Sequence, residues 1–200
     1  MGVTNLVGSN DPEWVAATRH PFLTGVRDGT VHAAAFDTWL GQDRLFVDDL
    51  LWFQARLLAR APGPARQVLV DGCAGLVSEL AWFDRMAAER GQPGPGGPLP
   101  ATAEYRRLLE DLDTRPVPVA LTALWTIERV YLEAWGYAAP GAPQFRAFVE
   151  HWTVPEFVGY VDALTIAADT YPAPDGEELV RAVLRAEVLF WDTALTREAA

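Results

Sequence analysis

Four acidic residues fall inside helical stripes of apolar residues, where charged side chains are not expected. They are Asp43, Glu79, Glu128 and Glu187, and each has apolar or aromatic residues three or four positions away on both sides. This spacing places each acid on the buried face of its helix. One such carboxylate is commonly satisfied by an arginine or a backbone donor. Because burying an unpaired carboxylate costs several kcal/mol, four together predict a bound ligand, metal or proton.

The residues one helical turn after these acids argue against a metal centre. Di-iron sites in helical bundles use a histidine three residues after a glutamate, but here those positions are aromatic: Phe46, Trp82, Tyr131 and Phe190. Each histidine of the chain lies near a predicted helix end, where surface or capping roles are expected: His20, His32 and His151. The sequence therefore predicts no metal ligand and no cofactor.

An acid beside an aromatic ring one turn away suits a different ligand, a flat heterocycle that contains nitrogen. Rings stack on aromatic side chains, and carboxylates bind amino groups or ring nitrogens. The alternative is ordinary core packing, which accounts for some of these aromatic residues. Cys73 is predicted to be a small buried residue rather than a nucleophile, because no partner base is evident.

The acids must be positioned by long helices, since apolar residues recur at helical steps and alternating strand patterns are missing. A first short helix begins near Asp11 and ends at His20-Pro21. A Pro/Gly-rich loop over residues 91–100 separates two helical halves. The fold class predicted is all-α, a single-domain helical bundle over residues 1–200. The remaining predicted helices cover about 33–60, 65–90, 101–112, 117–138, 143–152, 155–170 and 175–197.

Composition excludes several classes of partner. The net charge is −11 and every positive side chain is an arginine, which opposes binding to nucleic acid or anionic lipid. No apolar run approaches the roughly 20 residues that span a bilayer, and the first residues lack the pattern of a signal peptide. We therefore expect a cytoplasmic protein that contacts neither nucleic acid nor membrane.

Several stretches, taken in order, resemble the TenA/thiaminase II family, which has a haem-oxygenase-like helical fold. The resemblance spans about residues 20 to 195, and each stretch is specific only as part of the series. The stretches are His20-Pro21-Phe22, Asp28-Gly29-Thr30, Phe36-x-x-Trp39-Leu40-x-Gln42-Asp43, Glu79-Leu80-Ala81-Trp82-Phe83, Leu124-Trp125-Thr126-Ile127-Glu128-Arg129-Val130-Tyr131 and Glu187-x-x-Phe190-Trp191-Asp192.

The resemblance implies an activity and roles for particular residues. The family hydrolyses aminopyrimidines from degraded thiamin to hydroxymethylpyrimidine, and some members also cleave thiamin. By position, Asp43 matches the aspartate that contacts the pyrimidine amino group and ring nitrogen. Tyr131 matches a tyrosine near the reacting centre, and Glu187 matches the glutamate thought to handle protons at the leaving amine. Relatives generally form dimers or tetramers, so a homodimer or homotetramer is expected.

This sequence departs from the best-known branch of the family. Ile127 occupies the position of that branch's catalytic cysteine, and Phe46 and Trp152 occupy positions of ring-stacking tyrosines. The pattern resembles the branch that lacks the cysteine and is associated with a glutamate. Glu79 and Glu128 both qualify for that role.

The leading hypothesis is a metal-free hydrolase that converts aminomethyl- or formylaminomethyl-pyrimidine to hydroxymethylpyrimidine. In it Asp43 anchors the ring and Phe46 and Trp152 sandwich it, with Trp82 as a further binding residue. Glu187, with Glu79 or Glu128, is predicted to activate water and protonate the departing amine, and Tyr131 is a further predicted catalytic residue. One alternative is a non-catalytic pyrimidine-binding or regulatory protein, and another is an oxidase on the same fold, which the missing histidines disfavour.

Overall fold

The protein is described from a computed structural model, which describes residues 2–6, 8, 11–92, 94 and 96–195. The helices are η1 (Val3–Asn5), α1 (Pro12–Thr18), α2 (Pro21–Asp28), α3 (Ala33–Arg60), α4 (Gly63–Glu89), α5 (Pro100–Thr114), α6 (Val117–Ala138), α7 (Arg146–His151), α8 (Pro155–Thr170) and α9 (Gly176–Asp192). The described ranges contain no strand. The predicted all-α class is therefore confirmed, and residues 196–197 of the last predicted helix lie outside the described residues.

The prediction missed one helix. His20-Pro21 was expected to end a helix, and α1 does stop at Thr18, but Pro21 also begins α2. Proline suits the first helical position because its missing N–H would be unpaired there anyway. His20 has extended backbone angles, and its Nδ1 accepts a hydrogen bond from the Phe22 N–H at 3.3 Å. His20 is therefore a helix N-cap, and the chain turns from one helix directly into the next.

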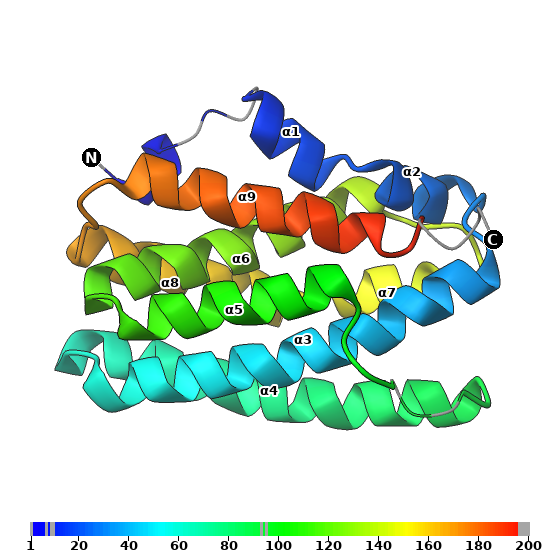
Figure 1. Ribbon diagram of the computed structural model, residues 1–200, viewed down its shortest axis with the longest axis horizontal. Coiled ribbons are helices and arrows are strands. Elements are labelled where there is room, and N and C mark those ends of the chain that lie inside the picture. The colour runs from blue at the N-terminus through cyan, green and yellow to red at the C-terminus, as the bar shows by residue number, and fades with distance from the viewer. Residues whose placement is uncertain (1, 7, 9–10, 93, 95, 196–200) are drawn as a thin grey trace.

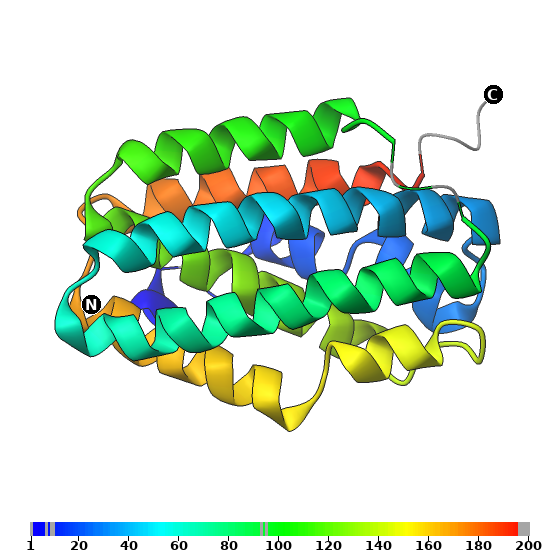
Figure 2. The same cartoon turned by 90° about the horizontal axis from the view of Figure 1, so that it is seen from below.

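The long helices lie roughly alongside one another, and α6 runs through their midst (Figures 1 and 2). It packs against α1, α2, α3, α5, α7, α8 and α9. A helix surrounded in this way must be apolar on most of its faces. The segment Ala120–Ile127 is buried at every position, and Glu128 is the acid that follows it. The acids of interest thus come from α3, α4, α6 and α9.

Gln42 fixes the start of α5 after the Pro/Gly-rich loop. Its side-chain oxygen accepts hydrogen bonds from the Leu99 N–H at 2.8 Å and the Thr102 hydroxyl at 2.7 Å. Its amide nitrogen donates to the Gly97 carbonyl at 3.3 Å. A buried amide with both ends satisfied is a stable anchor. The residue before Asp43 therefore ties the loop to α3.

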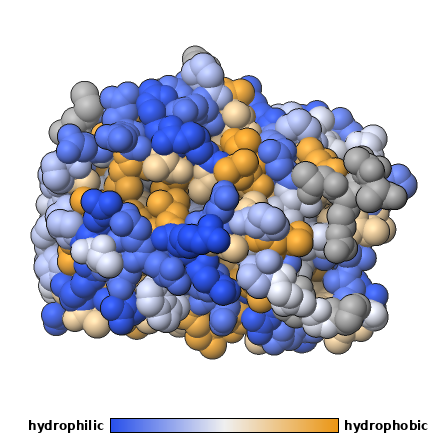
Figure 3. Space-filling model, viewed as in Figure 1, coloured by the Kyte–Doolittle hydropathy of each residue, from blue (hydrophilic) through white to orange (hydrophobic). Residues whose placement is uncertain are grey.

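On the face seen in Figure 1, hydrophilic residues predominate and apolar residues form separate patches (Figure 3). The most exposed large apolar side chains include Ile166 on α8, at 71 %, and Val77 on α4, at 57 %. None of the helices in the described part of the chain is long and apolar enough to cross a membrane.

Candidate active site

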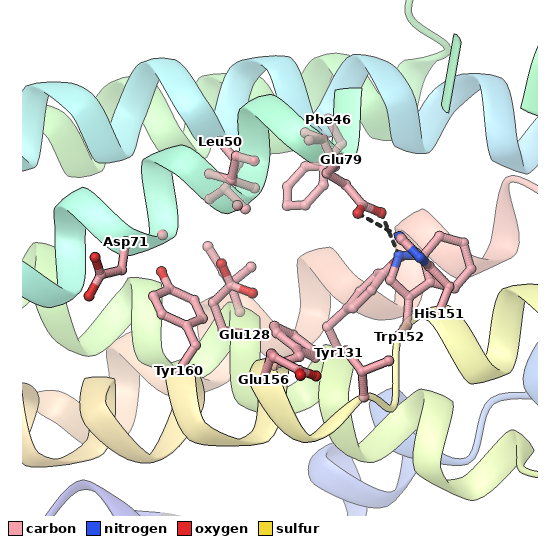
Figure 4. A pocket seen from close by; sticks show the side chains of 17 residues that line it. Phe46, Leu50, Asp71, Glu79, Glu128, Tyr131, His151, Trp152, Glu156 and Tyr160 are labelled. Atoms are coloured by element: carbon pink, nitrogen blue, oxygen red, sulfur yellow. Dashed lines mark hydrogen bonds and ion pairs between the residues drawn. The ribbon is translucent and has the colours of Figure 1, made fainter. Parts of the chain in front are cut away.

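A cavity of about 360 Å³ lies between α3, α4, α6 and α8, and the C-terminal end of α7 closes one end of it. A volume in this range suits a small organic molecule. In Figure 4, Glu79, His151 and Trp152 lie together at one end, Asp71 and Tyr160 lie at the other, and Glu128 lies between them. The lining residues are Phe46, Val47, Leu50, Asp71, Gly72, Gly75, Leu76, Glu79, Ile127, Glu128, Tyr131, His151, Trp152, Val154, Glu156, Phe157 and Tyr160.

Five of the eight predicted site residues line this cavity: Phe46, Glu79, Glu128, Tyr131 and Trp152. The other three lie behind its wall. Asp43 and Glu187 are buried one layer deeper, and Trp82 lies behind the imidazole of His151. The structure therefore brings most of the predicted residues together and arranges them in two layers.

Glu79 is held by two donors from neighbouring residues of the chain. The indole N–H of Trp152 donates to Glu79 Oε1 at 2.6 Å, and His151 Nε2 lies 2.7 Å from Glu79 Oε2. Both carboxylate oxygens of Glu79 are therefore held by fixed partners. The side chain of Glu79 is 19 % exposed, so this acid lies at the wall rather than deep in the core.

Glu128 is in the opposite situation. Its side chain is 94 % buried, faces the cavity, and has no hydrogen-bond partner among the residues that the structure describes. Burial raises its pKa to about 8, and the nearby charges of Glu79 and Glu187 act in the same direction. Near pH 7 this group is therefore mostly a neutral carboxylic acid that can donate a proton.

Asp43 is fully buried behind Tyr131. The Tyr131 hydroxyl donates to Asp43 Oδ2 at 2.8 Å, and Oδ1 has no partner within the described residues. Burial raises the pKa of Asp43 well above its usual range, despite the hydrogen bond from Tyr131, and Glu79 and Glu187 contribute further repulsion. Asp43 is thus a fully buried acid with one unused oxygen.

Glu187 accepts a short hydrogen bond of 2.5 Å from the Tyr105 hydroxyl. Burial raises the pKa of Glu187 to about 8, and the hydrogen bond opposes that shift. The ring of Tyr105 packs on Phe46, with centroids 4.6 Å apart, and Phe46 itself lines the cavity. Phe46 therefore stands between the cavity and the layer that contains Glu187.

The expectation for His151 was wrong. It was placed at a helix end in a surface or capping role, and it does end α7, but it also lines the cavity and contacts Glu79. The other two histidines precede helices, and only His20 uses its side chain as a cap. Residues His151 and Glu79 are 72 positions apart, so no local pattern could have paired them.

The end of the cavity at Tyr160, opposite Glu79, was not predicted from the sequence (Figure 4). Tyr160 donates to Gln54 Oε1 at 3.1 Å, and Gln54 donates to the Leu69 carbonyl at 3.0 Å. The Tyr160–Gln54 contact passes Gly72 of α4, where an added Cβ would lie 2.0 Å from Gln54 Nε2 and 2.4 Å from the Tyr160 oxygen. Asp71 adds a carboxylate to this end (Figure 4).

The lining contains no thiol in the part of the chain that is described. Ile127 is buried and contacts the cavity, while Cys73 is half-buried on α4 outside the lining, where burial raises the pKa of its thiol. The described residues also contain no group of three or more histidine, cysteine, aspartate or glutamate side chains placed to hold a metal ion.

Known proteins share both the sequence pattern and the fold. The model of the TENA/THI-4/PQQC family matches residues 9–197. A probable bifunctional TENA-E protein from Glycine max is 34 % identical over 195 residues, covering 88 % of this chain and 85 % of that protein. The structure of a TenA homologue from Pyrococcus furiosus superposes with a TM-score of 0.87 at 26 % identity, covering 97 % of this chain and all of that one.

A putative TenA-like thiaminase from Sulfolobus solfataricus also has this fold, with a TM-score of 0.83, 20 % identity, and coverage of 98 % of this chain and 94 % of that one. The all-α architecture is thus haem-oxygenase-like, as the resemblance implied. The family match extends over all the helices that carry the cavity and the acids behind it. The chain belongs to the TENA/THI-4/PQQC family.

Proposed function

We propose that the chain hydrolyses the bond between the exocyclic methylene carbon and the amine nitrogen of an aminopyrimidine, forming a hydroxymethylpyrimidine. Family membership supports a thiamin-related pyrimidine hydrolase. The observation that carries the finer assignment is the contrast between two glutamates in one cavity. Glu79 accepts hydrogen bonds at both oxygens, whereas burial raises the pKa of Glu128 to about 8. Two acids in such different surroundings can divide the roles of general base and general acid.

In this proposal Glu79 takes a proton from a water molecule as the water oxygen attacks the methylene carbon. The carbon–nitrogen bond breaks, its electron pair stays on nitrogen, and Glu128 gives that nitrogen a proton. The products are hydroxymethylpyrimidine and ammonia from the aminomethyl substrate, or formamide from the formylaminomethyl substrate. Water is the only co-reactant that this step needs. The position of Ile127 in the lining is consistent with a route that uses no thiol.

Phe46 and Trp152 are the proposed stacking residues, and both contribute to the lining. Asp43 remains the proposed anchor. In this role its Oδ1, unpartnered among the described residues, contacts the amino group or ring nitrogen of the aminopyrimidine, while Oδ2 accepts from Tyr131. Because Asp43 lies behind Tyr131, this role requires Phe46 and Tyr131 to move apart when the ring enters. Glu187 lies behind Phe46 and accepts from Tyr105, whereas Glu128 lines the cavity, so Glu128 is the proton donor that the geometry favours.

The test is incubation of the purified chain with aminomethyl- and formylaminomethyl-pyrimidine, followed by mass spectrometry for hydroxymethylpyrimidine. We expect turnover of at least one substrate. Calorimetry with the same two compounds separates the alternatives. Binding without product would support a non-catalytic pyrimidine-binding protein, and neither binding nor product would contradict the assignment of the cavity to a pyrimidine.

A further inference from the structure

The lining of the cavity is strongly unbalanced in charge. Among its described residues are four carboxylates, and His151 is the one basic side chain. The carboxylates belong to Asp71, Glu79, Glu128 and Glu156. A single base among several acids has a large electrostatic effect on whichever acid it contacts.

His151 contacts Glu79 in a fixed geometry. Its imidazole lies parallel to the Trp82 ring, with centroids 3.9 Å apart and planes 4° apart. Trp82 is itself held edge-on by Phe148, at 5.5 Å, and by Trp152, at 5.2 Å. The stack leaves Nε2 of the imidazole 2.7 Å from Glu79 Oε2. Trp82, one of the predicted binding residues, therefore supports His151.

Two consecutive residues of the chain hold the two oxygens of one carboxylate. His151 contacts Oε2 of Glu79 and Trp152 donates to Oε1 at 2.6 Å. With both oxygens fixed, the carboxylate has one orientation relative to the cavity. A fixed orientation matters for catalysis, because a general base must be within hydrogen-bond reach of the proton that it removes.

We propose that His151 is a positioning residue of the proposed hydrolase and acts through Glu79, aligning that carboxylate as the base for water. This inference rests on the proposed function. His151 donates its Nε2 proton to Glu79 and does not itself touch the reacting atoms.

The surroundings of Glu79 explain why a basic partner is needed. Asp43 faces it from α3, Glu128 and Tyr131 face it from α6, and Glu156 lines the same cavity from α8. Each of these groups is neutral or negative, so each disfavours a charge on Glu79 when it ionises. Among the described lining residues, His151 is the one basic side chain that offsets this group of acids.

The first test compares His151→Phe, which keeps a stacking ring but has no donor, with His151→Gln, which keeps a neutral donor. We expect kcat at pH 7 to fall about 100-fold for His151→Phe and about tenfold for His151→Gln, with KM nearly unchanged. The acidic limb of the kcat profile should move to higher pH in His151→Phe. His32→Gln is the matched control, because His32 is exposed and makes no side-chain cap contact.

A double-mutant cycle separates an effect through Glu79 from a structural one. If His151 acts through Glu79, His151→Phe should reduce activity little further in a Glu79→Gln background. Equal losses in both backgrounds, or a pH profile parallel to that of the wild type, would overturn the inference.

An NMR spectrum of the imidazole nitrogens of His151 provides a readout that does not depend on turnover. Glu79→Gln should shift these resonances, because the contact of Nε2 with a carboxylate oxygen is lost. Unchanged resonances contradict the His151–Glu79 coupling. If the coupling holds but the wild type hydrolyses neither pyrimidine, the proposed function fails separately.

Discussion

Two aromatic regions meet at Trp152, and only one of them has the features of a site. On one side, Trp39, Trp135 and Trp191 form a fully buried cluster. The ring centroid of Trp39 lies 5.4 Å from that of Trp135 and 5.7 Å from that of Trp191. On the other side is the acid-lined cavity. The indole nitrogen of Trp39 has no partner in the described part of the chain, whereas that of Trp152 donates to Glu79. Aromatic content is thus common to both regions, and the carboxylate partners distinguish the cavity.

The first prediction concerns the packed region. Replacing Trp191 by alanine removes a fully buried side chain that also donates to the Ala17 carbonyl at 3.0 Å. We expect the free energy of unfolding to fall by about 4 kcal/mol, measured by urea denaturation. Trp52→Ala is the control, because Trp52 is 45 % exposed and should cost less than about 1 kcal/mol. Similar losses at both positions would show that the cluster is not the stabilising core.

The second prediction concerns the cavity. Glu128→Gln keeps the size of the side chain but removes its proton donor, so kcat for the aminopyrimidine should fall at least about 100-fold. The fold should be retained, because Glu128 has no hydrogen-bond partner to lose among the described residues. Glu150→Gln, at an exposed position on α7, is the matched control. A loss in kcat below tenfold would indicate that another group is the general acid.

The third prediction follows from the sign of the pKa shifts. Glu128 and Glu187 have pKa values of about 8 in the folded chain, against an ordinary 4.5. Between these values the folded state binds more protons than the unfolded state, so stability should fall as pH rises from about 5 to about 8. In Glu128→Gln the free energy of unfolding should decline less over this window, by on the order of 2 kcal/mol. Parallel pH profiles for variant and wild type would be inconsistent with a buried neutral Glu128.

The fourth and smallest effect is expected at the residue that both regions share. Trp152→Phe keeps a stacking ring but removes the donor to Glu79, so kcat should fall roughly tenfold, or about 1.4 kcal/mol in activation free energy. Trp39→Phe removes an indole N–H that has no partner among described residues. Its turnover should stay within about twofold of the wild type. Equal effects of the two substitutions on kcat would contradict the distinction between the packed core and the cavity.

The helices were largely predictable because proline, glycine and apolar spacing act locally. The predicted ranges 33–60 and 117–138 coincide with α3 and α6. The missed helix α2 shows the limit of such signals, since a proline after a helix can end one helix and begin another. The dipeptide itself does not show whether its proline ends one helix or begins the next. Here Pro21 begins α2, whose Phe22 and Leu23 pack in the core.

The site was only partly predictable, for a different reason. Helical spacing gives the face of a residue but not its depth. It therefore placed Asp43, Glu128 and Glu187 inside correctly without distinguishing those behind the wall from those that line it. His151 could not be inferred, because its partner comes from another helix.

The shape of the cavity at its Tyr160 end depends on Gly72, which has no side chain. Gly72 lets the Tyr160 hydroxyl reach Gln54 across α4, and one methyl group there would collide with both side chains. Any residue larger than glycine at position 72 would therefore displace the Tyr160–Gln54 hydrogen bond and change the shape of this end of the cavity.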